Sequence, residues 1–156
     1  MSKNIKLVAT DIDGVWTDAK MHYTENGDFM KSFSTYDGMG VEMLRNKNIE
    51  TVIMTSENSN IVLRRAEKLK IKEVYIDEKN KLERLKKICS NKKITLNEVA
   101  YIGDDINDVE VLKNVGISAL TNNSPIKEQI KVDYITEKKG GDGAFREFVE
   151  LILKEN

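Results

Sequence analysis

Aspartates gather after two apolar segments of this 156-residue chain. Asp11 and Asp13 come directly after the run LVAT and just before Gly14. A second acidic group follows the run EVAYI in the segment GDDINDVE: Asp104, Asp105 and Asp108. Two carboxylates about 4 Å apart repel by roughly 4 kcal/mol at an effective dielectric constant of about 20, so three at one place need a cation among them. Mg²⁺ fits best, because it takes one or two carboxylates, keeps several waters and leaves room for a phosphate oxygen.

Hydroxyl and ammonium groups follow two further apolar runs. Thr55 and Ser56 come after IETVIM, where a hydroxyl and free backbone N–H groups can bind a phosphoryl oxygen. Lys79 and Lys81 follow EVYI and open a segment with helical periodicity. A lysine there is unfavourable to the helix dipole, so it is better explained by a negative partner. A carboxylate nucleophile, a second acid, a hydroxyl, a lysine and metal-binding acids together constitute a phosphoryl-transfer site.

Strand-like and helix-like segments alternate along the chain and must position these groups. The expected strands are residues 5–10, 49–55, 73–76, 98–103, 116–120 and 133–136. The expected helices are residues 38–47, 59–70, 79–91, 107–115, 124–131 and 143–155. Such alternation predicts a doubly wound α/β domain with a mostly parallel sheet, in which ligands bind beyond the carboxyl ends of the strands. The two acidic groups converge there if the first and fourth strands are near neighbours.

Residues 20–34 depart from this alternation. Apolar and polar residues alternate on both sides of ENGD, and an Asn-Gly pair between two such runs predicts a β-hairpin, inserted just after the first strand. Ser124 and Pro125 are typical of a helix N-cap and the first helical position. Because no internal repeat, low-complexity tract or linker interrupts the chain, we expect a single domain over residues 1–156.

Composition excludes several classes of function. Charged residues make up 33% and hydrophobic residues 40%, and the net charge of -1 recruits neither nucleic acid nor an anionic membrane surface. Cys89 is the only cysteine, which excludes an internal disulfide and agrees with a reducing compartment. No apolar run approaches the roughly 18 to 20 residues of a membrane span, and the N-terminus lacks the apolar region of a signal peptide. We therefore expect a cytoplasmic protein.

The ordered set of polar groups resembles the haloacid dehalogenase-like phosphatases. The resemblance rests on DIDG at residues 11–14, Thr55, Lys81 and GDDIND at residues 103–108. It implies that Asp11 attacks phosphorus and forms an aspartyl phosphate, while Asp13 protonates the leaving alkoxide and later activates water. Thr55 and Lys81 would hold the phosphoryl oxygens. The implied Mg²⁺ ligands are Asp11, the backbone carbonyl of Asp13 and Asp104. Asp108 would not bind the ion directly but would hold these ligands in position.

Within that family the chain is similar to a capless subfamily that dephosphorylates 2-keto-3-deoxy sugar acids. The similarity covers DGVWTD, RRAEKLK, AYIGDDIND and KKGGDGAFREFVE. It implies a homotetramer built by the hairpin, in which a neighbour's glycine-rich tail closes the site. Here that tail would be Lys138, Lys139, Gly140, Gly141, Asp142 and Gly143. Arg64, Arg65 and Arg146 could bind a sugar carboxylate, although surface charge is the default interpretation of arginines on helices.

This resemblance leaves two candidate substrates, 2-keto-3-deoxynononate 9-phosphate and 3-deoxy-manno-octulosonate 8-phosphate. Glu57 and Lys68 are similar to the nononate type, which ranks first, with the octulosonate close behind. Ser56 departs from both types, because glycine is usual at its position.

Other interpretations stay open beside this one. Asp13 before Gly14 could be a turn residue, and Asp108 could cap a helix as well as support a metal. The glycine-rich segment could be a plain loop that starts a helix. The whole domain could resemble the non-catalytic tetramerisation domain of sialic-acid cytidylyltransferases, although that role predicts the loss of acids that this chain retains. A phosphatase or phosphotransferase acting on another small sugar phosphate is the remaining alternative.

Overall fold

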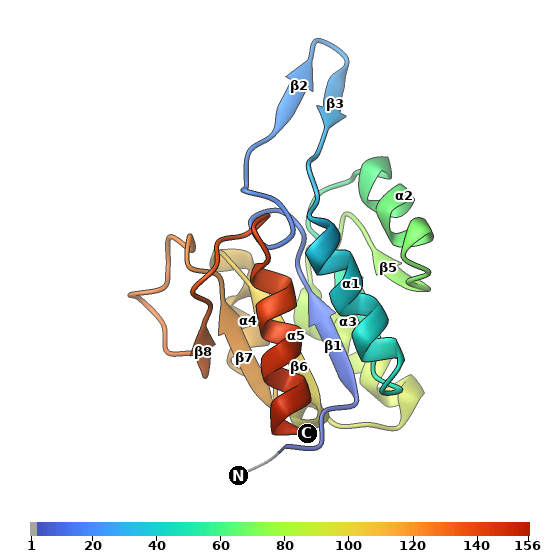
Figure 1. The fold of residues 1–156 in the computed structure, drawn as a ribbon, viewed down its shortest axis with the longest axis vertical. Helices are drawn as coiled ribbons and strands as arrows, with labels where there is room; N and C mark the ends of the chain where they lie inside the picture. The colour runs from blue at the N-terminus through green and yellow to red at the C-terminus, as the bar shows by residue number, and fades with distance from the viewer. Residues whose placement is uncertain (1–2) are drawn as a thin grey trace.

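In the computed structural model, which describes residues 3–156, a six-stranded parallel sheet forms the centre of the protein (Figure 1). The strands are β1 (Leu7–Thr10), β4 (Glu50–Met54), β5 (Glu73–Tyr75), β6 (Val99–Gly103), β7 (Ile117–Leu120) and β8 (Tyr134–Ile135). Their order is β5-β4-β1-β6-β7-β8, and each neighbouring pair is parallel. The predicted doubly wound α/β fold is confirmed, and the first and fourth predicted strands, β1 and β6, are neighbours.

Helices cover both faces of the sheet. They are α1 (Thr35–Arg45), α2 (Asn60–Lys68), α3 (Lys81–Lys92), α4 (Val109–Leu112) and α5 (Ala144–Glu155), with short 3₁₀ turns at Leu96–Glu98 and Ile106–Asp108. Residues of β1 alternate between two cores: Val8 packs with α1, α2 and α5, whereas Leu7 and Ala9 pack with α3 and α4. Burial on both faces explains why the strands are apolar runs rather than alternating segments.

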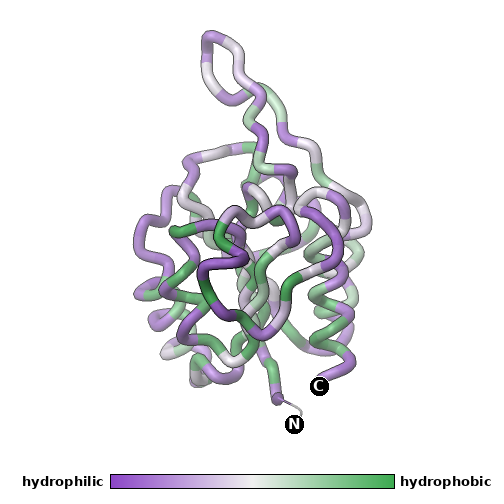
Figure 2. Tube along the Cα trace, turned by 90° about the vertical axis from the view of Figure 1, so that its left-hand side faces the viewer, coloured by the Kyte–Doolittle hydropathy of each residue, from purple (hydrophilic) through white to green (hydrophobic). Residues whose placement is uncertain are grey.

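The predicted hairpin consists of β2 (His22–Thr24) and β3 (Gly27–Met30), paired antiparallel. It projects from the body of the protein, above the carboxyl ends of the parallel strands (Figures 1 and 2). Tyr23 and Phe29 on this hairpin are exposed by 66% and 63%. These exposed fractions are high for aromatic side chains, which usually bury most of their surface.

The predicted helix at residues 124–131 is wrong. Residues 125–129 form turns, and the hydroxyl of Ser124 donates a hydrogen bond to the backbone carbonyl of Asp104 at 2.6 Å while accepting one from the N–H of Ile126 at 3.3 Å. Ser124 therefore closes a local turn and supports the acidic loop instead of starting a helix.

Two other helices differ from their predicted bounds by three residues at one end. The helix expected at residues 107–115 begins as a 3₁₀ turn and continues only as the four residues of α4. Helix α1 begins at Thr35, three residues before the predicted start, because the side chain of Ser34 caps it by accepting a hydrogen bond from the N–H of Tyr36 at 3.1 Å. No helix within residues 3–156 is both long enough and apolar enough to span a bilayer.

Candidate active site

The register of β1 and β6 brings the two acidic groups together. Thr10 pairs with Ile102, and the N–H of Asp11 donates to the carbonyl of Ile102 at 3.1 Å. Both strands therefore end at the same edge of the sheet. Carboxylate oxygens of three buried residues, Asp11, Asp104 and Asp108, lie within 4.8 Å of one another. The predicted convergence of residues far apart in the sequence is thus observed.

The loop after β1 requires glycine at residue 14. Gly14 has a φ of +88°, and a Cβ atom there would lie 1.8 Å from Oδ2 of Asp104. Any other residue would both strain the backbone and displace the carboxylate. Asp11 Oδ1 accepts a hydrogen bond from the N–H of Ile12 at 2.8 Å and lies 3.2 Å from the ammonium of Lys81. These contacts fix the rotamer of the first aspartate.

Asp108 lies at the bottom of the site and is fully engaged by the protein. Its Oδ1 lies 2.8 Å from Lys81 Nζ and also accepts a hydrogen bond from the hydroxyl of Tyr101. Its Oδ2 accepts hydrogen bonds from the N–H groups of Asp104 and Asp105 at 2.9 and 3.3 Å. With four donors around it, Asp108 is better suited to hold Lys81 and the acidic loop than to bind a metal directly.

Burial and mutual repulsion shift the titration of the acids. Burial, reinforced by the charge of Asp108, raises the pKa of Asp11 to about 7. Burial and the charges of Asp11 and Asp108 raise the pKa of Asp104 to about 9. Burial alone would lower the pKa of Lys81, but Asp11 and Asp108 raise it, so this lysine stays charged. The site therefore holds more negative charge than Lys81 neutralises, and its hard oxygen donors fit a divalent cation held by Asp11 and Asp104.

A small pocket of about 190 Å³ opens above these acids. Its lining residues are Asp11, Asp13, Ala19, Thr55, Ser56, Glu57, Asp104, Asp105 and Asn107. The side chain of Asn107 donates a hydrogen bond to Ser56 Oγ at 2.9 Å, and thereby ties the loop after β4 to the acidic loop after β6. Seven of the residues that the sequence singles out therefore line one pocket: Asp11, Asp13, Thr55, Ser56, Glu57, Asp104 and Asp105.

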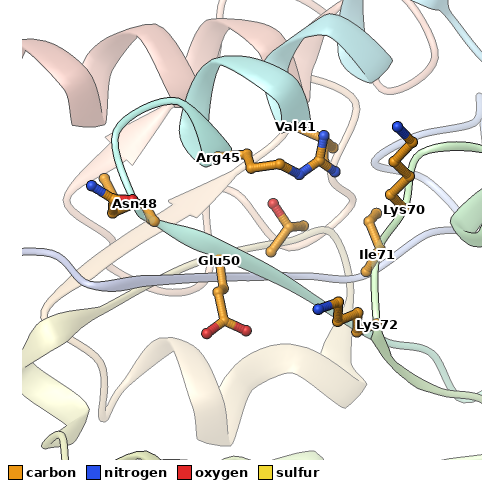
Figure 3. Close-up of a pocket in the computed structure, with 9 residues that line it drawn as sticks. Val41, Arg45, Asn48, Glu50, Lys70, Ile71 and Lys72 are labelled. Carbon is orange, nitrogen blue, oxygen red and sulfur yellow. The ribbon is translucent and has the colours of Figure 1, made fainter.

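A larger cavity of about 560 Å³ lies elsewhere (Figure 3). It is lined by residues of α1, the start of β4 and the loop between α2 and β5, including Arg45, Glu50, Lys70 and Lys72. None of the residues of the acidic cluster lines this cavity. The smaller pocket is therefore the candidate active site, because its lining includes Asp11 and Asp104 of the acidic cluster, and Asp11 in turn contacts the buried Lys81.

The helix cations lie outside this pocket within the described chain. Arg64 is exposed and forms an ion pair with Glu67 at 3.1 Å, and Lys68 lines a separate depression beside α1. Arg65 stacks over the ring of Phe33, with 5.6 Å between its guanidinium carbon and the ring centroid. Arg146 forms an ion pair with Glu150 at 2.9 Å. A role for these residues in substrate binding stays a prediction.

The glycine-rich segment packs against its own chain. The N–H of Gly140 donates to Asn123 Oδ1 at 2.7 Å, and the N–H of Gly141 donates to the carbonyl of Val15 at 3.2 Å. A Cβ atom at residue 140 would lie 2.0 Å from the carbonyl oxygen of Gly14. Within its own chain, close backbone contacts hold this segment against the loop after β1. The expectation that it closes a neighbour's site stays a prediction. Lys138 is exposed beside it.

Sequence reasoning missed three residues that contact the site. Tyr101 lies within an apolar strand, where the sequence predicts only a core side chain. In the fold its hydroxyl donates a hydrogen bond to Asp108. Asn107 reads as part of a helix start, yet its side chain contacts Ser56 across the pocket. Lys31 lies in the hairpin segment and forms an ion pair with Asp13 at 2.8 Å. No sequence signal marks Lys31, since its contact spans two loops whose relative position depends on the fold.

Comparisons with known proteins agree with the geometry. Residues 47–148 match the family model of the haloacid dehalogenase-like hydrolases. The chain is 36% identical over 152 residues to the 3-deoxy-D-manno-octulosonate 8-phosphate phosphatase of Haemophilus influenzae, covering 97% of this chain and 84% of the relative.

Two solved structures are similar over nearly the whole chain. The cobalt-bound form of the Haemophilus influenzae phosphatase has a TM-score of 0.92 at 36% identity, covering 97% of this chain and 89% of that one. The Moraxella catarrhalis phosphatase, in complex with magnesium, phosphate and the sugar acid KDO, has a TM-score of 0.93 at 37% identity, covering 99% and 88%. The chain therefore belongs to the haloacid dehalogenase-like hydrolases, in the group that includes the 3-deoxy-D-manno-octulosonate 8-phosphate phosphatases.

Proposed function

We propose that this protein is a Mg²⁺-dependent phosphatase that hydrolyses the phosphate ester of a 2-keto-3-deoxy sugar acid. The observation that carries the proposal is the buried cluster of Asp11, Asp104 and Asp108 around Lys81, beneath a pocket that Thr55 also lines. The named relatives are phosphatases of such a substrate. Retention of every acid argues against the alternative of a non-catalytic assembly domain.

Each side chain has a step that its position suits. Asp11 Oδ attacks phosphorus and forms an aspartyl phosphate, while Asp13 gives a proton to the leaving alkoxide oxygen and then takes one from the water that hydrolyses the intermediate. Lys81, 3.2 Å from Asp11, stabilises the phosphoryl oxygens together with Thr55. Mg²⁺, bound by Asp11, the carbonyl of Asp13 and Asp104, would supply charge neutralisation of the phosphoryl group.

The choice between two substrates rests on few residues. The relatives named above act on the eight-carbon 3-deoxy-D-manno-octulosonate 8-phosphate, and this substrate is our first candidate. Glu57 lines the pocket, whereas Lys68 does not, so only one of the two residues that favoured the nine-carbon nononate lies in position to act within the chain. Ser56 stays a further candidate for specificity, because its hydroxyl contacts Asn107 at the pocket wall.

The proposed assembly is a homotetramer through the hairpin. Tyr23, Phe29 and Met30 expose 66%, 63% and 42% of their surface, which is costly for apolar side chains unless a partner covers them. Sedimentation of the wild type and of a variant with Tyr23→Ser and Phe29→Ser would test the assembly, since a hairpin interface predicts dissociation of the variant.

Turnover of the purified chain tests the function directly. We expect Mg²⁺-dependent release of phosphate from both keto-acid phosphates, loss of release in EDTA, and a kcat/KM ratio that identifies the substrate. Asp11→Asn should abolish turnover and retain the fold, whereas Asp77→Asn, an exposed aspartate outside the pocket, should retain activity. Turnover by Asp11→Asn would exclude Asp11 as the nucleophile, and no turnover by the wild type would favour the assembly role.

A further inference from the structure

Lys31 is a buried lysine at the base of the hairpin, directly after β3. Its side chain is only 1% exposed, and its ammonium lies 2.8 Å from Asp13 Oδ1 and 3.4 Å from the sulfur of Met21. A buried ammonium is costly unless a negative group compensates it. Within residues 3–156 the carboxylate of Asp13 is its one ion-pair partner. The ion pair therefore ties Lys31 firmly to a residue of the candidate active site.

The two oxygens of Asp13 are in different environments. Oδ1 accepts the hydrogen bond from Lys31, whereas Oδ2 is buried without a hydrogen-bond partner in the part of the chain that the structure describes. Asp13 also lines the pocket above Asp11. A buried carboxylate oxygen without a partner is unfavourable, and a group bound in the pocket could satisfy it. One oxygen is thus held by the protein, and the other remains available to a ligand.

We propose that Lys31 is a positioning residue for Asp13, which fixes the carboxylate so that Oδ2 meets the ester oxygen of the substrate. This inference rests on the proposed phosphatase function. A monoanionic phosphate ester brings a proton to Oδ2 when it binds, while Oδ1 keeps its hydrogen bond from Lys31. As the bond between phosphorus and the ester oxygen breaks, this proton passes to that oxygen and the sugar acid leaves as an alcohol. Asp13 then accepts a proton from the water that attacks the aspartyl phosphate. Lys31 keeps its own proton throughout and acts through orientation.

The position of Lys31 also links the hairpin to the chemistry. Met21 precedes β2 and Lys31 follows β3, so the two residues flank the base of the hairpin, and the Lys31 ammonium contacts the sulfur of Met21. The hairpin base is therefore built around the ion pair with Asp13. A displacement of the hairpin would move Lys31 and release the carboxylate that it holds.

The test compares two leaving groups. The comparison uses kcat/KM, which covers the steps up to departure of the leaving group and excludes hydrolysis of the aspartyl phosphate. Lys31→Met removes the charge and retains much of the volume, and we expect its kcat/KM for 3-deoxy-D-manno-octulosonate 8-phosphate to fall by about 100-fold or more, the range of a lost general acid. For p-nitrophenyl phosphate, whose nitrophenolate leaves without a proton, kcat/KM should fall by less than about 10-fold, because departure of this leaving group needs no acid. Lys31→Arg should restore a large part of the loss, because arginine retains the charge. Lys92→Met, which removes a lysine paired with Glu50 and Glu73 away from the pocket, should leave both activities unchanged.

A double variant separates positioning from a general loss of structure. Because Lys31 acts through Asp13, adding Lys31→Met to Asp13→Asn should cost no further activity on the sugar acid phosphate. Equal losses on the two substrates, or additive losses in the double variant, would overturn the positioning role. If Lys31→Met does not fold, the same comparison of leaving groups is made with Lys31→Gln, which also removes the charge. A wild type without turnover on either ester would instead refute the proposed function itself.

Discussion

Replacing Asp104 with asparagine should weaken the pH dependence of folding stability in the metal-free protein. Asp104 is only 7% exposed, and burial together with the charges of Asp11 and Asp108 raises its pKa to about 9. In the unfolded chain the same carboxyl has its ordinary pKa of 3.8. Between these two values the folded protein binds a proton that the unfolded chain does not, so stability falls as the pH rises through this window.

The magnitude follows from two separate considerations. One proton of difference between the folded and unfolded states costs about 1.4 kcal/mol per pH unit, or about 2.7 kcal/mol between pH 6 and pH 8. Carboxylate oxygens of Asp11, Asp104 and Asp108 lie within 4.8 Å of one another. At such a separation two charges repel by roughly 3 kcal/mol at an effective dielectric constant of about 20. The proton linkage and the charge repulsion therefore give about the same destabilisation of the folded state, and Asp104→Asn should remove this destabilisation.

Urea denaturation in EDTA at pH 6, 7 and 8 measures this effect. The free energy of unfolding of the wild type should fall more steeply with pH than that of Asp104→Asn, by about 1 kcal/mol per pH unit. Asp105→Asn, one residue further on and only half-buried, is the control and should retain the steep slope. Saturating Mg²⁺ should stabilise the wild type, by about 2.7 kcal/mol at a hundred times the Kd, and should do so more weakly in Asp104→Asn. Parallel slopes for the wild type and Asp104→Asn would refute the electrostatic reasoning.

Two further substitutions probe the same cluster. Lys81→Met should abolish phosphatase activity. It should also lower the free energy of unfolding at pH 8 by about 3 kcal/mol, because it leaves Asp11 and Asp108 without their ion-pair partner. Lys79→Met, at an exposed lysine, is the control, and equal stability of the two variants would contradict this account. Gly14→Ala should reduce stability by more than about 2 kcal/mol and abolish the Mg²⁺-dependent rise in Tm, because its Cβ atom would collide with Asp104. Gly27→Ala, also at positive φ but with open space around it, should retain the rise in Tm.

The central part of the site could be predicted because it depends only on chain topology. Asp11 and Asp104 each follow a buried parallel strand, and the carboxyl ends of parallel strands meet at one edge of the sheet. Thr55 follows the neighbouring strand β4, and Lys81 begins α3. For such residues, recognising the strands is enough to place the side chains near one another.

Residues outside the strand ends could not be placed in the same way. The base of the hairpin carries Lys31 to Asp13 through a path that no periodicity records. The segment at residues 124–131 has a typical helix start, but the contact of Ser124 with the carbonyl of Asp104 takes precedence over local preference. Arg64 and Lys68 have the residue types of a substrate-binding site, yet both lie on exposed parts of α2 away from the pocket. In each case tertiary contacts decide what the local sequence leaves open.

The charges of the site explain why its lysine and its acids belong together. Lys81 contacts Asp11 and Asp108, so it neutralises part of a cluster that also contains Asp104. In the metal-free protein, protons on Asp11 and Asp104 neutralise the remaining negative charge, in agreement with the raised pKa values of both residues. A protonated Asp11 is a poor nucleophile, so the same burial that assembles the site also suppresses its reactivity until a cation replaces those protons. Burial of the acids, binding of the cation and activation of Asp11 are therefore consequences of one electrostatic arrangement.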